Sequence, residues 1–346
     1  MLCNTPRIGR ILCIVISSMQ ATLAAEPAQP KGANVALVYS KQYEINLGGL
    51  ERLHPFDIHK YTKICRQLIK DRLVRREDFH VPKPVDREQI LLVHTEKYLE
   101  RLKDPKRVAE YLEAPMVGAL PAAMLDRGML SAFRHASGGT LLAARLALKH
   151  GVAINLGGGY HHAKPDNGEG FCIYADMPIA IRVLRKEKLI CRALVIDLDV
   201  HQGNGTAVCC QGDESVFTFS MHQGDIYPIP KEKSDRDIEL PAGTDDRQYM
   251  KILRKALPEL IDRARPDLVL LQAGCDVLAG DPLASLKITK QGIVTRDSFV
   301  VDTCVERAIP IVVTLGGGYS PEAWSVQHAS IRQILATHGV LRRDSP

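Results

Sequence analysis

Two adjacent histidines, His161 and His162, follow a run of three glycines at residues 157–159 and a single tyrosine. Successive side chains point to opposite faces on a β-strand and diverge by about 100° on an α-helix. Two imidazoles that serve one site must therefore lie on an irregular loop, which glycine permits because it tolerates positive φ angles. On its own, the same pair is also typical of a solvated surface turn, so the rest of the chain has to distinguish the two interpretations.

A second group of polar side chains has the composition and spacing of a metal site. Asp197, Asp199 and His201 occupy alternate positions at the end of an apolar segment, so Asp199 and His201 can face one point with Asp197 behind them. Asp276 follows another apolar segment and adds a carboxylate. Two aspartates and one histidine form a three-ligand site with an open position, which suits a Zn²⁺ ion that carries a water molecule.

The histidine pair would complete such a site. An activated water that attacks a carbonyl group needs a base to take its proton and an acid to protonate the leaving group. His161 and His162 can supply both functions if their loop faces the metal. Tyr319 follows a second glycine run at residues 316–318, and its hydroxyl can donate a hydrogen bond to a developing oxyanion. The sequence therefore predicts hydrolysis at a metal ion.

These motifs share one kind of position, the carboxyl end of an apolar strand. Four continuously apolar segments alternate with predicted helices, which indicates a parallel sheet whose strands are buried on both faces. They are residues 152–155, 193–196, 268–271 and 311–313. Ligands of open parallel sheets bind outside the carboxyl ends of the strands. We therefore predict an α/β fold with three layers, built as a single catalytic domain at residues 34–346.

The flanking elements are predicted from composition and periodicity. Strands are expected at residues 34–40 and 215–222. Helices are expected at 57–73, from 94 onward, and at 137–151, 176–188, 246–266, 295–307 and 321–339. In the helix at 137–151, Ser137 is the expected N-cap and Gly151 the expected stop.

The N-terminus has the pattern of a signal peptide. Residues 1–10 contain two arginines and no acidic residue, residues 11–19 are mostly apolar, and small residues then precede a polar segment. This pattern predicts a signal peptide at residues 1–25 and a linker at 26–33. The apolar run is too short to span a membrane, which takes about 20 residues. Cleavage of the leader would make the protein secreted or periplasmic, and without cleavage we expect it in the cytoplasm.

Overall composition argues against two further classes. The net charge of +5 includes Arg7 and Arg10 of the leader and is too small to indicate nucleic-acid binding, and no concentrated basic stripe occurs. Nine cysteines, two of them in the leader, show no CxxC pair and no regular spacing, which argues against a disulfide scaffold.

In combination, the motifs resemble the zinc-dependent histone deacetylase family. The segments concerned are INLGGGYHHA (154–163), GFCIYAD (170–176), VIDLDVHQGNG (195–205), AGCDVLAGDPL (273–283) and LGGGYS (315–320). The early segment GLERLHPFDIHK (49–60) and the compact length are most similar to the class IV branch, the histone deacetylase 11 type. The resemblance implies a fold of the arginase/deacetylase type and hydrolysis of N-acyl-lysine to lysine and a carboxylate.

The resemblance also implies roles for individual residues. Asp199, His201 and Asp276 would bind one Zn²⁺, His161 and His162 would be the catalytic pair, and Tyr319 would polarise the substrate carbonyl. The substrate tunnel would be lined by Phe171, Tyr227, Gly159 and Gly317. A potassium ion is expected behind the zinc, held by Asp197, Ser220 and the backbone carbonyls of Asp199, His201 and Met221.

Two features depart from the commonest pattern of this family. Many members have HHGDG where this chain has HQGNG, so Asn204 replaces an aspartate that the family pattern pairs with His162. The predicted leader is the other departure, because most members are intracellular. An exported protein could not act on histones in chromatin.

Three alternative functions follow from the same residues. An arginase-like ureohydrolase would need a second metal and a carboxylate two residues past His201, where this chain has Gly203. An acetylpolyamine amidohydrolase remains open, because its substrates also present an acylated amine on an aliphatic stem. A catalytically silent acyl-lysine binding module is disfavoured, because every predicted catalytic position is filled.

Overall fold

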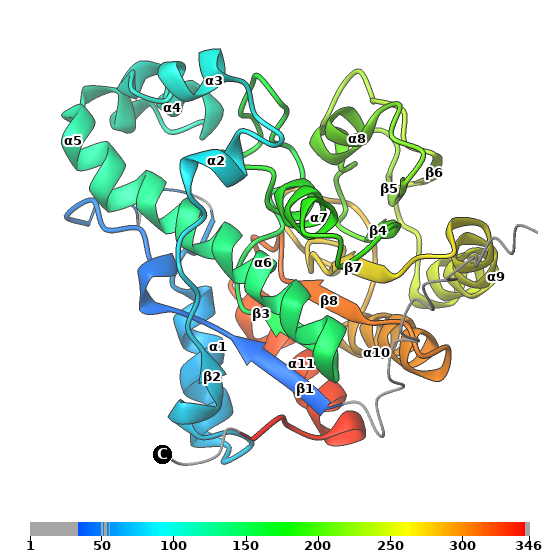
Figure 1. Ribbon diagram of the computed structural model, residues 1–346. Helices are drawn as coiled ribbons and strands as arrows, with labels where there is room; N and C mark the ends of the chain where they lie inside the picture. The colour runs from blue at the N-terminus through cyan, green and yellow to red at the C-terminus, as the bar shows by residue number, and fades with distance from the viewer. Residues whose placement is uncertain (1–33, 50, 52–53, 55, 343–346) are drawn as a thin grey trace, which may run out of the picture.

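A parallel sheet of eight strands runs through the middle of the protein (Figure 1). The computed structural model describes residues 34–49, 51, 54 and 56–342. The strands lie in the order β2-β1-β3-β8-β7-β4-β5-β6, and each neighbouring pair is parallel. Their bounds are β1 (Asn34–Val38), β2 (Phe79–His80), β3 (Gly151–Asn155), β4 (Ala193–Asp197), β5 (Val216–Gln223), β6 (Arg236–Leu240), β7 (Leu268–Gln272) and β8 (Ile311–Thr314).

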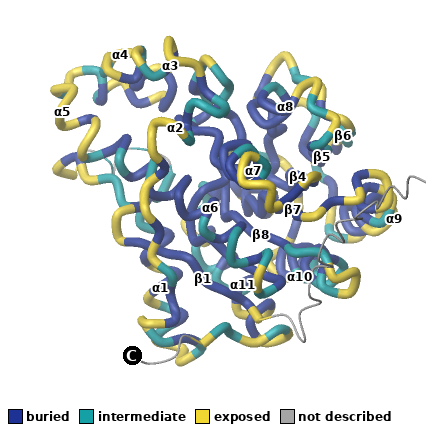
Figure 2. Tube along the Cα trace, viewed as in Figure 1, coloured by how far each residue is buried: buried dark blue, intermediate teal, exposed yellow. Residues whose placement is uncertain are grey.

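Helices cover both faces of the sheet, which gives the predicted three layers. One face packs against α1 (Lys60–Lys70), α9 (Asp246–Ala264), α10 (Lys290–Glu306) and α11 (Ala323–His338), and the other against α6 (Ser131–His150) and α7 (Asp176–Lys186). Successive strand residues alternate between the two cores, so in β3 Val152 and Ile154 face one core and Ala153 the other. Continuously apolar strands are what two buried faces require. Figure 2 shows that the central strands are buried.

Short elements complete the chain around this sheet. They are η1 (Lys41–Tyr43), η3 (Arg76–Asp78), α2 (Arg87–Ile90), α3 (Glu96–Arg101), α4 (Pro105–Tyr111), η4 (Pro115–Ala119), α5 (Ala122–Leu125), η5 (Asp126–Leu130) and α8 (Asn204–Cys210). The sequence predictions did not include β2, β6 or α8. Helix α8 begins at Asn204, so the HQGNG motif leads directly into a helix.

The four strands that carry the motifs are direct neighbours in the order β3-β8-β7-β4. Their carboxyl ends therefore meet at one edge, although the segments lie far apart in the sequence. The predicted strands at 34–40 and 215–222 are confirmed as β1 and β5. The fold class is confirmed.

The helix expected at 137–151 is longer than predicted, and Ser137 is not its N-cap. Helix α6 begins at Ser131, so Ser137 lies buried in its interior, while Gly151 ends the helix with a φ of 91°. The glycines that looked like a helix start lie where another segment approaches closely. A Cβ on Gly138 would lie 1.9 Å from the carbonyl oxygen of Lys83.

The predicted leader at residues 1–25 and the linker at 26–33 lie outside the described residues and stay predictions. Among the helices of the described residues, none is both long and apolar enough to cross a membrane. The seven cysteines of this part of the chain are all free, and six of them are buried, as expected for a protein that is not a disulfide scaffold.

The close approach at Gly138 gives a first prediction. Alanine normally stabilises a helix interior by about 1 kcal/mol relative to glycine. Gly138→Ala should instead lower the free energy of unfolding by about 1–3 kcal/mol, because the new methyl group has no space beside Lys83. Chemical denaturation measures the difference. Gly118→Ala is the matched control, since its Cβ would meet Ala109 at an ordinary 3.5 Å, and equal effects at the two positions would refute the steric argument.

Candidate metal centre and active site

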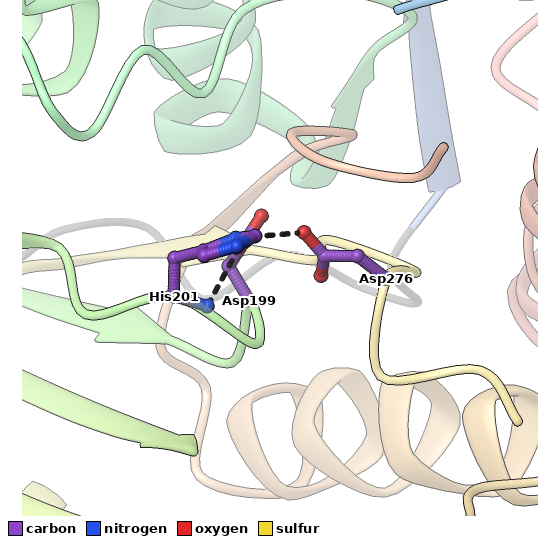
Figure 3. A group of neighbouring side chains, drawn as sticks. All are labelled: Asp199, His201 and Asp276. Atoms are coloured by element: carbon purple, nitrogen blue, oxygen red, sulfur yellow. Dashed lines mark hydrogen bonds and ion pairs between the residues drawn. The ribbon is translucent and has the colours of Figure 1, made fainter. Parts of the chain in front are cut away.

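The loops after β4 and β7 bring three potential metal ligands together. Figure 3 shows Asp199 and His201 from the first loop and Asp276 from the second. One ligand atom from each residue lies within 4.8 Å of the other two, and all three residues are buried. His201 Nδ1 lies 3.2 Å from Asp199 Oδ1 and 3.3 Å from Asp276 Oδ2. The structure therefore places the three predicted ligands at one point.

The chemistry of these three residues fits a divalent cation. Asp276 Oδ2 is buried, and apart from its ion-pair contact with His201 Nδ1 it has no hydrogen-bond partner among the described residues. A Cβ on Gly317 would lie 2.1 Å from this oxygen and 2.6 Å from Asp199 Oδ2, so the glycine leaves both carboxylates open. Burial and the neighbouring charge of Asp199 raise the pKa of Asp276. A divalent cation would neutralise this repulsion between buried like charges.

Backbone groups hold the two carboxylates in place. Asp199 Oδ2 accepts a hydrogen bond from the backbone N–H of Gly317 at 2.9 Å, and Asp276 Oδ1 accepts one from the backbone N–H of Val200 at 2.9 Å. Each donor lies on a different loop from the carboxylate that it contacts. The loops after β4, β7 and β8 are thus tied to one another through the candidate ligands.

The residues expected behind the zinc also lie together. Asp197 is paired with Ser220 in the register of β4 and β5, and Met221 follows Ser220 on β5. Ser220 Oγ accepts a hydrogen bond from the backbone N–H of Gly203 and lies 2.9 Å from His222 Nδ1. The potassium ion itself stays a prediction.

The two histidines lie side by side on the loop after β3, with different partners. Their ring centroids are 4.0 Å apart. His161 Nδ1 lies 2.8 Å from Asp197 Oδ2, and His162 Nδ1 lies 2.7 Å from Asn204 Oδ1. Both rings are buried, so the interpretation of residues 157–162 as a solvated surface turn is wrong.

The partner of His162 defines which of its nitrogens carries the proton. Asn204 Oδ1 also accepts a hydrogen bond from the backbone N–H of Gly205 at 2.9 Å, so the amide presents its oxygen on this side. His162 must then donate through Nδ1, and its Nε2 keeps a lone pair. This is the tautomer that a general base requires.

Charge differs strongly between the two imidazoles. Burial by itself would lower the pKa of His161, but the carboxylates of Asp197 and Asp199 outweigh it and raise the pKa to about 9. Burial and the neighbouring charge of His161 lower the pKa of His162 well below its usual value. In the metal-free protein near pH 7, His161 is therefore protonated and His162 is neutral.

Tyr319 reaches the same site from the loop after β8. Its ring lies 6.2 Å from that of His201, at 84°, and its backbone N–H donates to Asp281 Oδ2 at 2.8 Å. Burial, together with the charges of Asp276 and Asp199, raises the pKa of the Tyr319 phenol well above its usual value. The hydroxyl thus keeps its proton and can donate a hydrogen bond.

The histidine pair and Tyr319 line a cavity with about 90 Å³ of space for the centres of water-sized spheres. Of the four predicted tunnel residues, Gly159, Gly317 and Phe171 line it and Tyr227 does not. Most of the other side chains that line it are apolar and include Ile45, Leu47, Met116, Val117, Met129 and Phe133. Tyr227 is 38% exposed, and its ring lies 5.0 Å from that of His162.

Three residues that the sequence predictions missed hold the glycine runs. Lys60 is fully buried, and its Nζ donates to the carbonyl of Gly316 at 2.6 Å. Gln272 Nε2 donates to the carbonyl of Gly159 at 2.9 Å, and Asp176 Oδ2 accepts from the N–H of Gly159 at 2.9 Å. In the sequence, these three residues are recognisable only as polar side chains beside apolar segments. Residue type alone does not show which backbone group each of them contacts.

Comparison with known proteins identifies the family of this chain. The family model of the histone deacetylase domain matches residues 54–335. Histone deacetylase 2 of Arabidopsis thaliana is 36% identical over 305 residues, or 87% of this chain and 79% of the relative. An uncharacterized protein of Picosynechococcus sp. is also 36% identical, over 84% of this chain and 92% of its own length.

More distant relatives extend the comparison. Acetoin utilization protein AcuC of Staphylococcus aureus is 29% identical over 79% of this chain and 75% of its own length. The crystal structure of the HDA15 HD domain superposes with a TM-score of 0.69 at 20% identity, over 88% of this chain and 92% of that domain, which supports the fold. By its family model, its relatives and its sheet, this chain belongs to the histone deacetylase family.

Proposed function

We propose that this chain is a Zn²⁺-dependent hydrolase that removes acyl groups from N-acyl-lysine. One observation carries the proposal: the buried Asp199–His201–Asp276 cluster lies beside a histidine pair and a tyrosine that line an apolar cavity. An aliphatic lysine stem suits an apolar passage, and the amide at its end would meet the polar groups.

Asp199, His201 and Asp276 would hold the Zn²⁺ ion. A Zn²⁺ ion bound there would act as a Lewis acid on the acyl carbonyl and would increase the acidity of a water molecule. The potassium ion expected behind it belongs to the same proposal, with Asp197, Ser220 and the carbonyl of Met221 among its ligands.

His162 would carry out the proton transfers. Its neutral Nε2 can take a proton from the attacking water and, once protonated, can return a proton to the leaving amine nitrogen. His161 would lie beside the reacting groups, held by the contact of its Nδ1 with Asp197 Oδ2 at 2.8 Å. Tyr319 would donate its hydroxyl hydrogen bond to the carbonyl oxygen as negative charge develops on it.

The apolar lining of the cavity supports a long acyl chain. Ile45, Leu47 and Phe133 line it together with the histidine pair and Tyr319, so an acyl group held at these polar residues would meet apolar surface. The class IV resemblance of residues 49–60 agrees with such a substrate, and we include class IV membership in the proposal. Acetylated polyamines are the competing substrates, and a substrate panel separates them from acyl-lysine peptides by the amine released.

The metal can be tested by stability as well as by activity. Asp276→Asn keeps the shape of the side chain and removes its charge. In the metal-free protein this variant should melt at a higher temperature than the wild type, because a carboxyl with a raised pKa costs stability at neutral pH. In the zinc-loaded protein the order should reverse, because the wild type gains more from the bound ion.

Thermal melting with chelator and with added zinc measures both states, and metal analysis gives the occupancy. Turnover of an acyl-lysine peptide should be lost in Asp276→Asn. An equal gain in melting temperature from zinc in both proteins would remove Asp276 from the metal site.

Tyr319 can be tested by deletion of its hydroxyl alone. Tyr319→Phe should fold normally and lower kcat by about 10²–10³-fold, the typical cost of one lost oxyanion donor. Steady-state kinetics on an acyl-lysine peptide measures the change. An unchanged kcat with a raised KM would make Tyr319 a substrate-binding residue.

Acyl preference is tested with peptides of graded chain length. We expect a higher kcat/KM for long acyl chains than for acetyl, because each buried methylene adds about 0.8 kcal/mol of binding. Ala132 lines the cavity, so Ala132→Val and Ala132→Phe should shorten the preferred chain in that order while acetyl-lysine turnover changes less. Equal or better kcat/KM on acetyl-lysine in the wild type would contradict the long-chain preference.

A further inference from the structure

Glu169 lies at the edge of the active site and has no part in the proposed chemistry. Its side chain is 26% exposed, and its Oε1 accepts a hydrogen bond from Asn204 Nδ2 at 2.5 Å. The same oxygen accepts a hydrogen bond from the Tyr227 hydroxyl at 3.2 Å and lies 3.4 Å from Lys164 Nζ. A carboxylate is thus joined to His162 through the amide of Asn204.

The amide of Asn204 creates a difficulty that a carboxylate at this position would not have. An aspartate presents an acceptor oxygen in either orientation of its side chain. An asparagine that turns by 180° would present its NH₂ group to His162 Nδ1 instead of its oxygen. His162 would then have to accept at Nδ1 and carry its proton on Nε2, and in that tautomer it cannot take a proton from water.

The N–H of Gly205 favours the amide oxygen on the side of His162, and a carboxylate on the other side reinforces this orientation, because it accepts hydrogen bonds and does not donate them. With Glu169 on one side, Asn204 must turn its NH₂ group away from His162, which leaves Oδ1 for His162 and for the N–H of Gly205. The hydrogen bond from Asn204 to Glu169 is charge-assisted and therefore stronger than one between neutral groups.

The loop that carries Glu169 is fixed against His162. The backbone N–H of Cys172 donates to the carbonyl of Glu169 at 2.9 Å and closes a tight turn. Gly170 lies inside this turn with a φ of 53°, and a Cβ there would lie 2.4 Å from His162 Cδ2. The turn that packs on His162 therefore also fixes the position of Glu169.

We propose that Glu169 is a positioning residue that fixes the tautomer of His162 by orienting the amide of Asn204. The inference rests on the proposed function, in which His162 is the base. It predicts that the effect of Glu169 depends on the residue at position 204, because an aspartate there has no amide to orient.

A double-mutant cycle tests this dependence on the zinc-loaded enzyme. Glu169→Ala should lower kcat by about tenfold or more, the equivalent of one hydrogen bond to a charged group, with little change in KM. Glu169→Gln, which can accept or donate, should change kcat less in the same direction. In an Asn204→Asp background, Glu169→Ala should leave kcat unchanged or raise it, because it removes a like charge beside Asp at 204.

A control variant isolates the contact with Asn204. Glu232 contacts the same Lys164 at 3.2 Å, so Glu232→Ala removes a matching carboxylate from that lysine and should leave kcat unchanged. If Glu232→Ala reproduced the kcat loss of Glu169→Ala, the effect would pass through Lys164 and the proposal would be wrong.

The tautomer itself gives a readout that needs no turnover. Two-bond nitrogen–hydrogen correlations in the ¹⁵N-histidine NMR spectrum of the zinc-loaded protein distinguish a proton on Nδ1 from one on Nε2, and His162→Ala assigns the signal. We expect the Nδ1–H tautomer in the wild type and in Glu232→Ala, and a growing Nε2–H fraction in Glu169→Gln and Glu169→Ala.

An unchanged tautomer in both Glu169 variants, or the same kcat loss from Glu169→Ala in the Asn204 and Asp backgrounds, would overturn the proposal. A wild type that shows the expected tautomers but no acyl-lysine turnover would refute the proposed function and leave the role of Glu169 in orienting Asn204 intact.

Discussion

The repulsion between two buried carboxylates is the constraint on which the site depends. Asp199 and Asp276 converge on one histidine nitrogen at the edge of the sheet, where little water is present to screen their charges. Backbone N–H groups from neighbouring loops hold one oxygen of each carboxylate and leave Asp276 Oδ2 with only its ion-pair contact to His201. A metal ion at the proposed site would convert this unfavourable arrangement into a favourable one. Without a cation, the fold has to hold the two carboxyl groups together against their repulsion.

The order of the strands is what makes this arrangement possible. The four motif-bearing strands are neighbours, so four loops reach one point without long excursions. Glycine lets those loops approach closely. A Cβ on Gly159 or on Gly316 would lie 2.1 Å from the side chain of Gln272, which sits between the two runs. The buried ammonium of Lys60 holds the second run by its carbonyl at Gly316. Rigid loops of this kind position a hydrolytic site before any substrate arrives.

The sequence predicted the parts of the site that follow from local periodicity. Asp199 and His201 are two residues apart after a strand, so their common direction could be read directly, and the strand-end position of Asp276 placed it at the same edge. Contacts between distant segments could not be predicted from local periodicity. Lys60 bonds to a residue 256 positions away, and no periodicity links the two. The prediction of Ser137 as an N-cap failed for a related reason. The glycines after it lie in the interior of α6, where neighbouring segments approach too closely for a Cβ.

The central claim is that Asp199, His201 and Asp276 bind the zinc ion of an acyl-lysine hydrolase. Anomalous diffraction at the zinc absorption edge tests it most directly, on crystals of protein that has been shown to hydrolyse an acyl-lysine peptide. The proposal predicts one peak at about 2.0–2.2 Å from an oxygen of each aspartate and about 2.0–2.1 Å from a ring nitrogen of His201, the usual distances for zinc. Active protein whose crystals show no zinc peak between these three residues would contradict it.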